Sequence, residues 1–127
     1  MKRLKPLLPT LKEKKRYLAF EIVSKDKITQ VSEISRAIWA GTISFLGTSG
    51  AAKTGIRVLS ETYNTQTQRG LIRVTHNGMN DIKASMTFIK QIENKPVILR
   101  SVGASGILAK AYKKYIEPQS GTGGTQW

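Results

Sequence analysis

The side chains of this chain that could do chemistry are mainly cationic. Lysine and arginine number 21 against 8 acidic residues, and the formal net charge is +13. Each phosphate that such a side chain neutralises releases condensed counterions, so an excess of this size favours a polyanionic partner. We interpret that partner as nucleic acid. A membrane surface fits less well, because the sequence has no basic amphipathic helix with aromatic anchors.

The candidate RNA-binding cations form two groups. The densest run is N-terminal and consists of Lys2, Arg3, Lys5, Lys12, Lys14, Lys15 and Arg16. Because this run leads directly into a predicted strand, RNA contact is favoured over a merely solvated tail. The second group lies on predicted strands or adjoining loops and consists of Lys53, Arg57, Arg69, Arg73 and Arg100. Each of these could equally pair with an acid, and Arg73 could pair with Glu21 on the neighbouring strand.

A third candidate is the segment SVGASG, residues 101–106, between a predicted strand and a predicted helix. Backbone N–H groups at a helix N-terminus can bind an anion, and Ser105 belongs to this segment. Lys110, Lys113 and Lys114 extend the same region with positive charge. Small residues are common at helix starts, so an ordinary turn remains the alternative.

Catalytic residues are not expected on this chain. It has one histidine, His76, no cysteine, and acids that are scattered singly, so no triad, carboxylate pair or metal-ligand set can be assembled. The lack of cysteine favours a reducing, cytoplasmic setting. No apolar run is long enough to span a membrane, and the basic N-terminus lacks the apolar region of a signal peptide, so export is not expected.

Hydrophobic periodicity predicts the elements that must position these residues. Strands are predicted at 16–24, 56–63, 69–76 and 96–102, with the second and third forming a hairpin. One helix is predicted from about 30 to 46, with Thr29 as its N-cap, an apolar stripe that includes Phe45, and a loop at 47–55. A second helix runs from the Asn77-Gly78 turn to about 93, and a third ends before Pro118.

This order is the split βαβ pattern, so we predict an α+β, ferredoxin-like or RRM-like βαββαβ sandwich with an extra C-terminal helix. Residues 1–15 are interpreted as a basic extended arm, because Pro6 and Pro9 do not continue a helix. Residues 16–117 form the single domain. Residues 118–127 are low in complexity and are predicted to be a disordered polar tail.

The stretch "RGLIRVTH", residues 69–76, resembles the RNA-reading strand of RRM domains. Its outward positions, Leu71, Arg73 and Thr75, carry no aromatic ring, so base stacking of the RRM kind is not expected. On the open face, Tyr17, Leu59, Leu71 and Ile98 would form an apolar patch. We predict that the C-terminal helix covers it, with a partner protein as the other candidate.

Four stretches resemble the ribonuclease P protein component 2 family, whose archaeal members are related to a eukaryotic ribonuclease P/MRP protein. They are "LPTLKEKKRYLAFEI" (8–22), "ISRAIWAGTISFLG" (34–47), "RGLIRVTH" (69–76) and "ILRSVGASGILAKA" (98–111). The family usually has a Ser-Gly-Thr-like turn where this chain has Val102 to Gly106, so the role of that turn is open.

The resemblance implies a non-catalytic subunit of ribonuclease P, the endoribonuclease that removes 5′ leaders from precursor tRNA. The RNA subunit would carry the active site and the magnesium ions, and this chain would have no cofactor. Its partners would be the ribonuclease P RNA, precursor tRNA indirectly, and protein component 3 in a possible two-plus-two assembly. The alternatives are a ribosomal-type RNA-binding protein of the same fold and a protein-interaction module whose charge is incidental.

Overall fold

The computed structural model describes residues 14–117. The strands are β1 (Lys15–Ser24), β2 (Arg57–Asn64), β3 (Arg69–Thr75), β4 (Gln91–Ile92) and β5 (Lys95–Ser105). The helices are α2 (Val31–Lys53), α3 (Met79–Met86) and α4 (Leu108–Ala111), with a 3-10 turn at His76–Gly78 and a π-helical turn at Tyr112–Ile116. Most of the N-terminal arm and the whole polar tail therefore lie outside the described residues.

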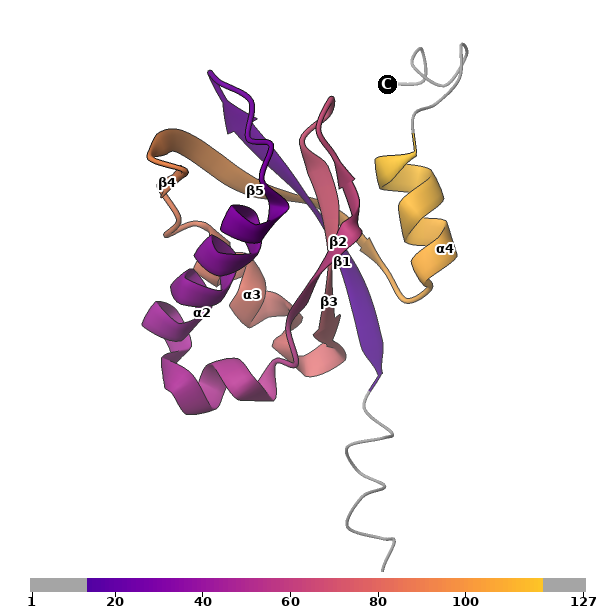
Figure 1. Ribbon diagram of the computed structural model, residues 1–127. Helices are drawn as coiled ribbons and strands as arrows, with labels where there is room; N and C mark the ends of the chain where they lie inside the picture. Colours follow the sequence, from indigo (N-terminus) through magenta and orange to yellow (C-terminus); the bar gives the residue numbers. More distant parts are fainter. Residues whose placement is uncertain (1–13, 118–127) are drawn as a thin grey trace, which may run out of the picture.

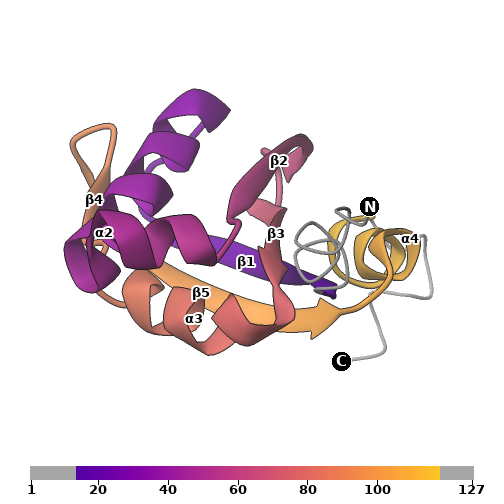
Figure 2. The ribbon, with the colours of Figure 1, turned by 90° about the horizontal axis from the view of Figure 1, so that it is seen from below.

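One antiparallel sheet organises the molecule, with strand order β2-β3-β1-β5-β4. The helices α2 and α3 lie on one side of the sheet and α4 on the other (Figures 1 and 2). This arrangement confirms the predicted α+β, ferredoxin-like fold with an extra C-terminal helix. Both long strands of the sheet centre, β1 and β5, pair along most of their length.

The main core lies between the sheet and the two helices α2 and α3. Leu18, Phe20 and Ile22 alternate along β1, and each is 2% exposed or less. They pack with the stripe residues Ile34, Ile38, Ile82 and Met86 and with Ile72 and Val74 of β3. The alternating apolar residues of the strands therefore pack against the apolar stripes of the helices, as predicted.

The glycine of the "RGLIRVTH" stretch has a packing role. Gly70 is buried, and a Cβ atom there would lie 2.8 Å from Cζ of Phe20. The ring of Phe20 also stacks on Tyr63, with centroids 6.3 Å apart. The glycine is required because the aromatic ring of the neighbouring strand occupies the position of its side chain.

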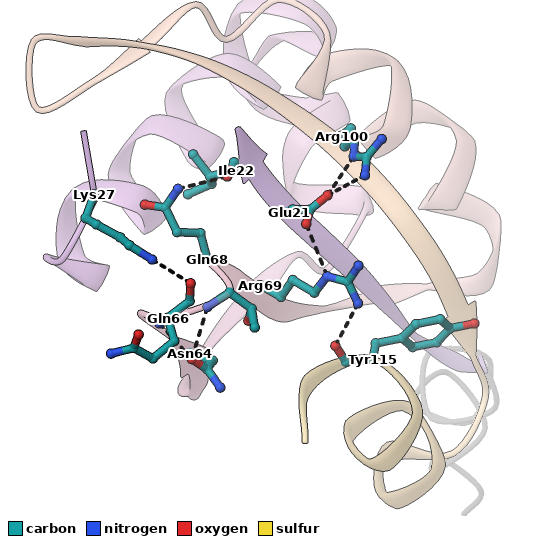
Figure 3. Close-up of polar contacts among 10 residues, drawn as sticks. Glu21, Ile22, Lys27, Asn64, Gln66, Gln68, Arg69, Arg100 and Tyr115 are labelled. Carbon is teal, nitrogen blue, oxygen red and sulfur yellow. Dashed lines mark hydrogen bonds and ion pairs between the residues drawn. The ribbon is translucent and has the colours of Figure 1, made fainter. Parts of the chain in front are cut away.

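The turn between β2 and β3 is held by polar contacts (Figure 3). Oδ1 of Asn64 accepts a hydrogen bond from the N–H of Gln66 at 2.8 Å, and Nζ of Lys27 donates to the Gln66 carbonyl at 2.6 Å. Gln68 has a left-handed φ of 57° and donates from Nε2 to the Ile22 carbonyl at 2.9 Å. These contacts hold the turn of the predicted hairpin.

The first helix extends further than predicted. Residues 48–53 continue as helix beyond Gly47, whose φ of 81° and ψ of 167° make a kink, so the predicted loop at 47–55 is wrong. The helix resumes because Ala51 becomes completely buried beyond the kink. Gln30, not Thr29, occupies the N-cap position, and it makes no side-chain capping bond.

The second helix is shorter than predicted, because it ends at Met86 and not near residue 93. Glu93 and Asn94 both have positive φ, 56° and 62°, which is the geometry of a tight hairpin turn between β4 and β5. Phe45 was predicted on the buried stripe, but it is 43% exposed and stacks on Phe88 at 5.2 Å. β5 also runs three residues beyond its predicted end.

Candidate RNA interface

The C-terminal helical segment covers the open face of the sheet. Ala111 and Ile116 pack on Ala19, Leu59 and Leu71, and all five are 6% exposed or less. Tyr17 packs beside this cluster and is partly buried. Because Leu71 lies under this cover, the outward face of β3 offers no platform for stacking bases.

One member of the predicted patch lies outside the cover. Ile98 is 64% exposed, and its pairing partner on β1, Val23, is 46% exposed. The helical segment contacts β1, β2, β3 and β5, but it packs on Ala19 in the first half of β1, whereas Val23 and Ile98 pair near the far end of that strand. The predicted cover therefore holds for Tyr17, Leu59 and Leu71 and not for Ile98.

Two of the candidate arginines are engaged in ion pairs. Oε1 of Glu21 lies 2.6 Å from an Nη of Arg100, and Oε2 of Glu21 lies 3.4 Å from Nε of Arg69 (Figure 3). Arg69 also donates to the Tyr115 carbonyl at 3.3 Å, which ties the end of the C-terminal segment to β3. Arg69 and Arg100 therefore stabilise the fold, and they share the one carboxylate of Glu21.

Arg73 does not pair with Glu21, because the register places Tyr17 opposite Arg73 on β1 and Arg57 opposite it on β2. Its Nε is buried and has no hydrogen-bond partner among residues 14–117. Arg57 is exposed on the edge strand β2. The ion pair between Arg73 and Glu21 that the sequence left open is therefore not formed.

The structure brings several of the candidate cations together at one end of the sheet, the lower end in Figure 1. Lys14 directly precedes β1, Lys15 and Arg16 are its first two residues, and Lys53 is the last residue of α2. Lys15 and Lys53 line one hollow of about 590 Å³, and Arg16 and Ser105 line another of about 520 Å³. We call the four cations Lys14, Lys15, Arg16 and Lys53 the basic end. Lys2, Arg3, Lys5 and Lys12 lie outside the described residues.

Residues 101–106 do not form the predicted anion site at a helix N-terminus. The helix that follows, α4, has only four residues, and the Ile107 N–H is already bonded to Oγ of Ser105 at 3.1 Å. The segment instead contributes Ser105 and Gly106 to the hollow that holds Arg16. Lys110, Lys113 and Lys114 are exposed on the C-terminal segment, with Nζ of Lys114 5.5 Å from the Tyr115 ring centroid.

His76 is the neighbour of Arg16 that sequence analysis did not select. Its N–H donates to the Lys14 carbonyl at 2.7 Å, which continues the pairing of β3 with the start of β1. Its Nδ1 accepts a hydrogen bond from Nε of Arg16 at 3.2 Å. The two residues are sixty positions apart, and only the strand register joins them.

One titratable group is strongly perturbed, and it lies away from the basic end. Burial raises the pKa of Tyr63 to about 12, and the nearby Glu93 carboxylate acts in the same direction. The Tyr63 hydroxyl therefore stays protonated at neutral pH and donates to the Ile28 carbonyl at 2.7 Å. This contact is structural.

Within residues 14–117, no three histidine, cysteine or acidic side chains are grouped as metal ligands. No helix of that part of the chain is long and apolar enough to cross a membrane.

Comparison with known proteins decides the family. The model of the Rpp14/Pop5 family matches residues 16–116. The chain belongs to the Rpp14/Pop5 family. A relative from Pyrococcus furiosus, named ribonuclease P protein component 2, is 33% identical over 114 residues, covering 90% of this chain and 92% of the relative. A protein of the same name from Methanosarcina mazei is 31% identical over 116 residues, covering 91% and 96%.

The fold of this Rpp14/Pop5 member also resembles a chain in the cryo-EM structure of yeast ribonuclease MRP. The TM-score is 0.57 and the sequence identity 14%, and the match covers 74% of this chain and 75% of the other. At that identity the likeness concerns the fold alone. The family match agrees with the four sequence stretches on which the resemblance was first noted.

Proposed function

We propose that this chain is a non-catalytic protein subunit of ribonuclease P that binds the RNA subunit and stabilises its catalytic domain. The observation that supports this most is the basic end, whose four cations come from the residues at the start of β1 and from the last residue of α2, at the point where the basic arm joins the domain. Membership of the Rpp14/Pop5 family supports ribonuclease P as the assembly, and the positive charge supports contact through RNA phosphates.

The proposed mechanism is electrostatic. Folding of a large RNA brings phosphates close together, and magnesium ions offset their repulsion. Lysine and arginine side chains held on a folded domain neutralise some of these phosphates and release counterions in doing so. The catalytic fold of the RNA then persists at a lower magnesium concentration. The magnesium ions and the cleavage chemistry belong to the RNA in this proposal, and no cofactor is assigned to this chain.

The partners we propose are the ribonuclease P RNA and protein component 3, in a two-plus-two assembly, in the cytoplasm. Precursor tRNA would be contacted only through the assembled complex. The relatives named ribonuclease P protein component 2 support this choice, because they match nearly the whole of this chain. A ribosomal-type RNA-binding protein would share the basic end but would not require these partners.

Reconstitution tests the proposal. The full chain is combined with its cognate ribonuclease P RNA and component 3, and cleavage of precursor tRNA is measured over a series of magnesium concentrations. We expect this chain to shift the activity profile to lower magnesium and to show no cleavage by itself. An unchanged magnesium requirement, or cleavage by the purified chain without RNA, would contradict the proposal.

A further inference from the structure

The hollow that holds Arg16 has the features of a site for one anionic group. It lies between the start of β1, the start of α3 and the junction of β5 with α4, and its volume is about 520 Å³. Polar groups line it from three separate parts of the chain: Arg16, His76, Asn77, Asn80 and Ser105. None of its lining residues is acidic.

The hydrogen bond between Arg16 and His76 leaves a defined set of donors. Nε of Arg16 donates to Nδ1 of His76, so the neutral imidazole carries its hydrogen on Nε2. Within residues 14–117, the Nη groups of Arg16 make no hydrogen bond, and no carboxylate lies within ion-pair distance of them. The guanidinium therefore has its outer edge available, and that edge binds a phosphate through two parallel N–H groups.

Gly106 leaves room for the guanidinium of Arg16. A Cβ atom on Gly106 would overlap an Nη atom of Arg16, so the arginine occupies the space that a side chain would need. The backbone of Gly106 is outside the left-handed region, and a side chain at this position would be accommodated by movement of the guanidinium. The hollow also borders the first residues of α3, where the helix dipole adds partial positive charge.

We propose that this hollow binds a phosphodiester group of the RNA backbone, with the Nη groups of Arg16 as its principal donors. An RNA strand is favoured over an isolated anion because Lys14 and Lys15 precede Arg16 directly on the chain and provide charge for adjacent phosphates. The inference rests on the proposed function, because it takes RNA as the polyanion.

Binding of the cognate ribonuclease P RNA by the full chain tests this site at several salt concentrations. Arg16→Gln removes the charge, whereas Gly106→Ala keeps the charge and displaces the guanidinium. We expect each variant to weaken binding about tenfold. We also expect each to reduce the slope of log affinity against log salt by about 0.7 to 0.9, the value of one lost phosphate contact.

The matched control is Arg36→Gln, which removes the same charge from an arginine that pairs with Glu33 on α2 and is 75% exposed. It should leave the slope unchanged. If Gly106→Ala binds like the unmodified chain, or if Arg36→Gln has the same effect as Arg16→Gln, the hollow is not the site. Each variant should give the same circular dichroism spectrum as the unmodified chain, which establishes that it is folded.

His76 provides a direct readout, because it is the only histidine of the chain. We expect inorganic phosphate and the RNA each to shift the NMR signals of its imidazole, and Arg16→Gln to abolish both shifts. A shift that persists in Arg16→Gln, or the absence of a shift with RNA, overturns the inference. If these variants bind normally while replacement of the arm lysines abolishes RNA binding, only the hollow is refuted. If the unmodified chain does not bind the RNA at all, the proposed function is refuted as well.

Discussion

At the scale of single residues, the cations of this chain divide into those with carboxylate partners and those without. Glu21 holds Arg69 and Arg100, and its side chain is only 19% exposed. Arg16 instead donates to the imidazole of His76 and has no carboxylate partner among residues 14–117. The number of lysine and arginine residues therefore overstates how many side chains are available to phosphates.

Glu21→Gln tests the structural role of this pair of contacts. The substitution leaves the partly buried Arg69 and the exposed Arg100 without a carboxylate, and we expect the free energy of unfolding to fall by about 1 to 2 kcal/mol. Urea denaturation followed by circular dichroism measures the change. Glu61→Gln is the control, because Glu61 is exposed and makes no ion pair among residues 14–117, and it should cost less than about 0.5 kcal/mol. Equal effects of the two substitutions would contradict the assignment.

Sequence alone could not sort these arginines. Glu21 and Arg73 lie on adjacent strands, and a pairing between them was reasonable until the register was known. In the sheet, Glu21 lies opposite Arg69 on one side and Arg100 on the other. A shift of two residues along a strand keeps every side chain on its face but changes its neighbours, so alternation predicts the face and not the partner.

At the scale of elements, strands and core stripes were predictable, because burial imposes a period on the sequence. Element ends were not. The helix α2 continues past Gly47 for about a turn and a half, because burial of Ala51 stabilises that part of the helix. The local sequence does not predict this tertiary contact. The helix α3 ends at Met86, and the chain then forms the short strand β4 and a tight turn at Glu93 and Asn94, with Ile92 in the core.

The C-terminal segment acts as a cover whose apolar contacts stabilise the open face. Ile116 is 2% exposed against Leu71 and Leu59, so Ile116→Ala should lower the free energy of unfolding by about 2 to 4 kcal/mol. Ile107→Ala is the matched control, because Ile107 is 52% exposed, and it should cost less than about 0.5 kcal/mol. Thermal and urea unfolding measure both. A negligible cost for Ile116→Ala would mean that the segment does not cover the sheet.

At the scale of the whole molecule, the two faces of the sheet are occupied and the charge gathers at one end. α2 and α3 cover one face, and the C-terminal segment covers most of the other. We therefore propose that RNA contacts the end of the sheet, where strand termini from distant parts of the sequence meet. The sequence indicated the partner through its charge and the arm through its lysines, but the meeting of Arg16, His76 and Gly106 depended on the fold.

The most direct test of this account is the salt dependence of the affinity of the full chain for its cognate ribonuclease P RNA. Four cations at the basic end, together with the arm, predict a linear fall of log affinity with log salt and a slope of about −3 or steeper. Replacing Lys14, Lys15, Arg16 and Lys53 with glutamine should make that slope shallower by about 3. An affinity that does not change with salt, or a slope that the four replacements leave intact, would contradict binding through phosphates at this end.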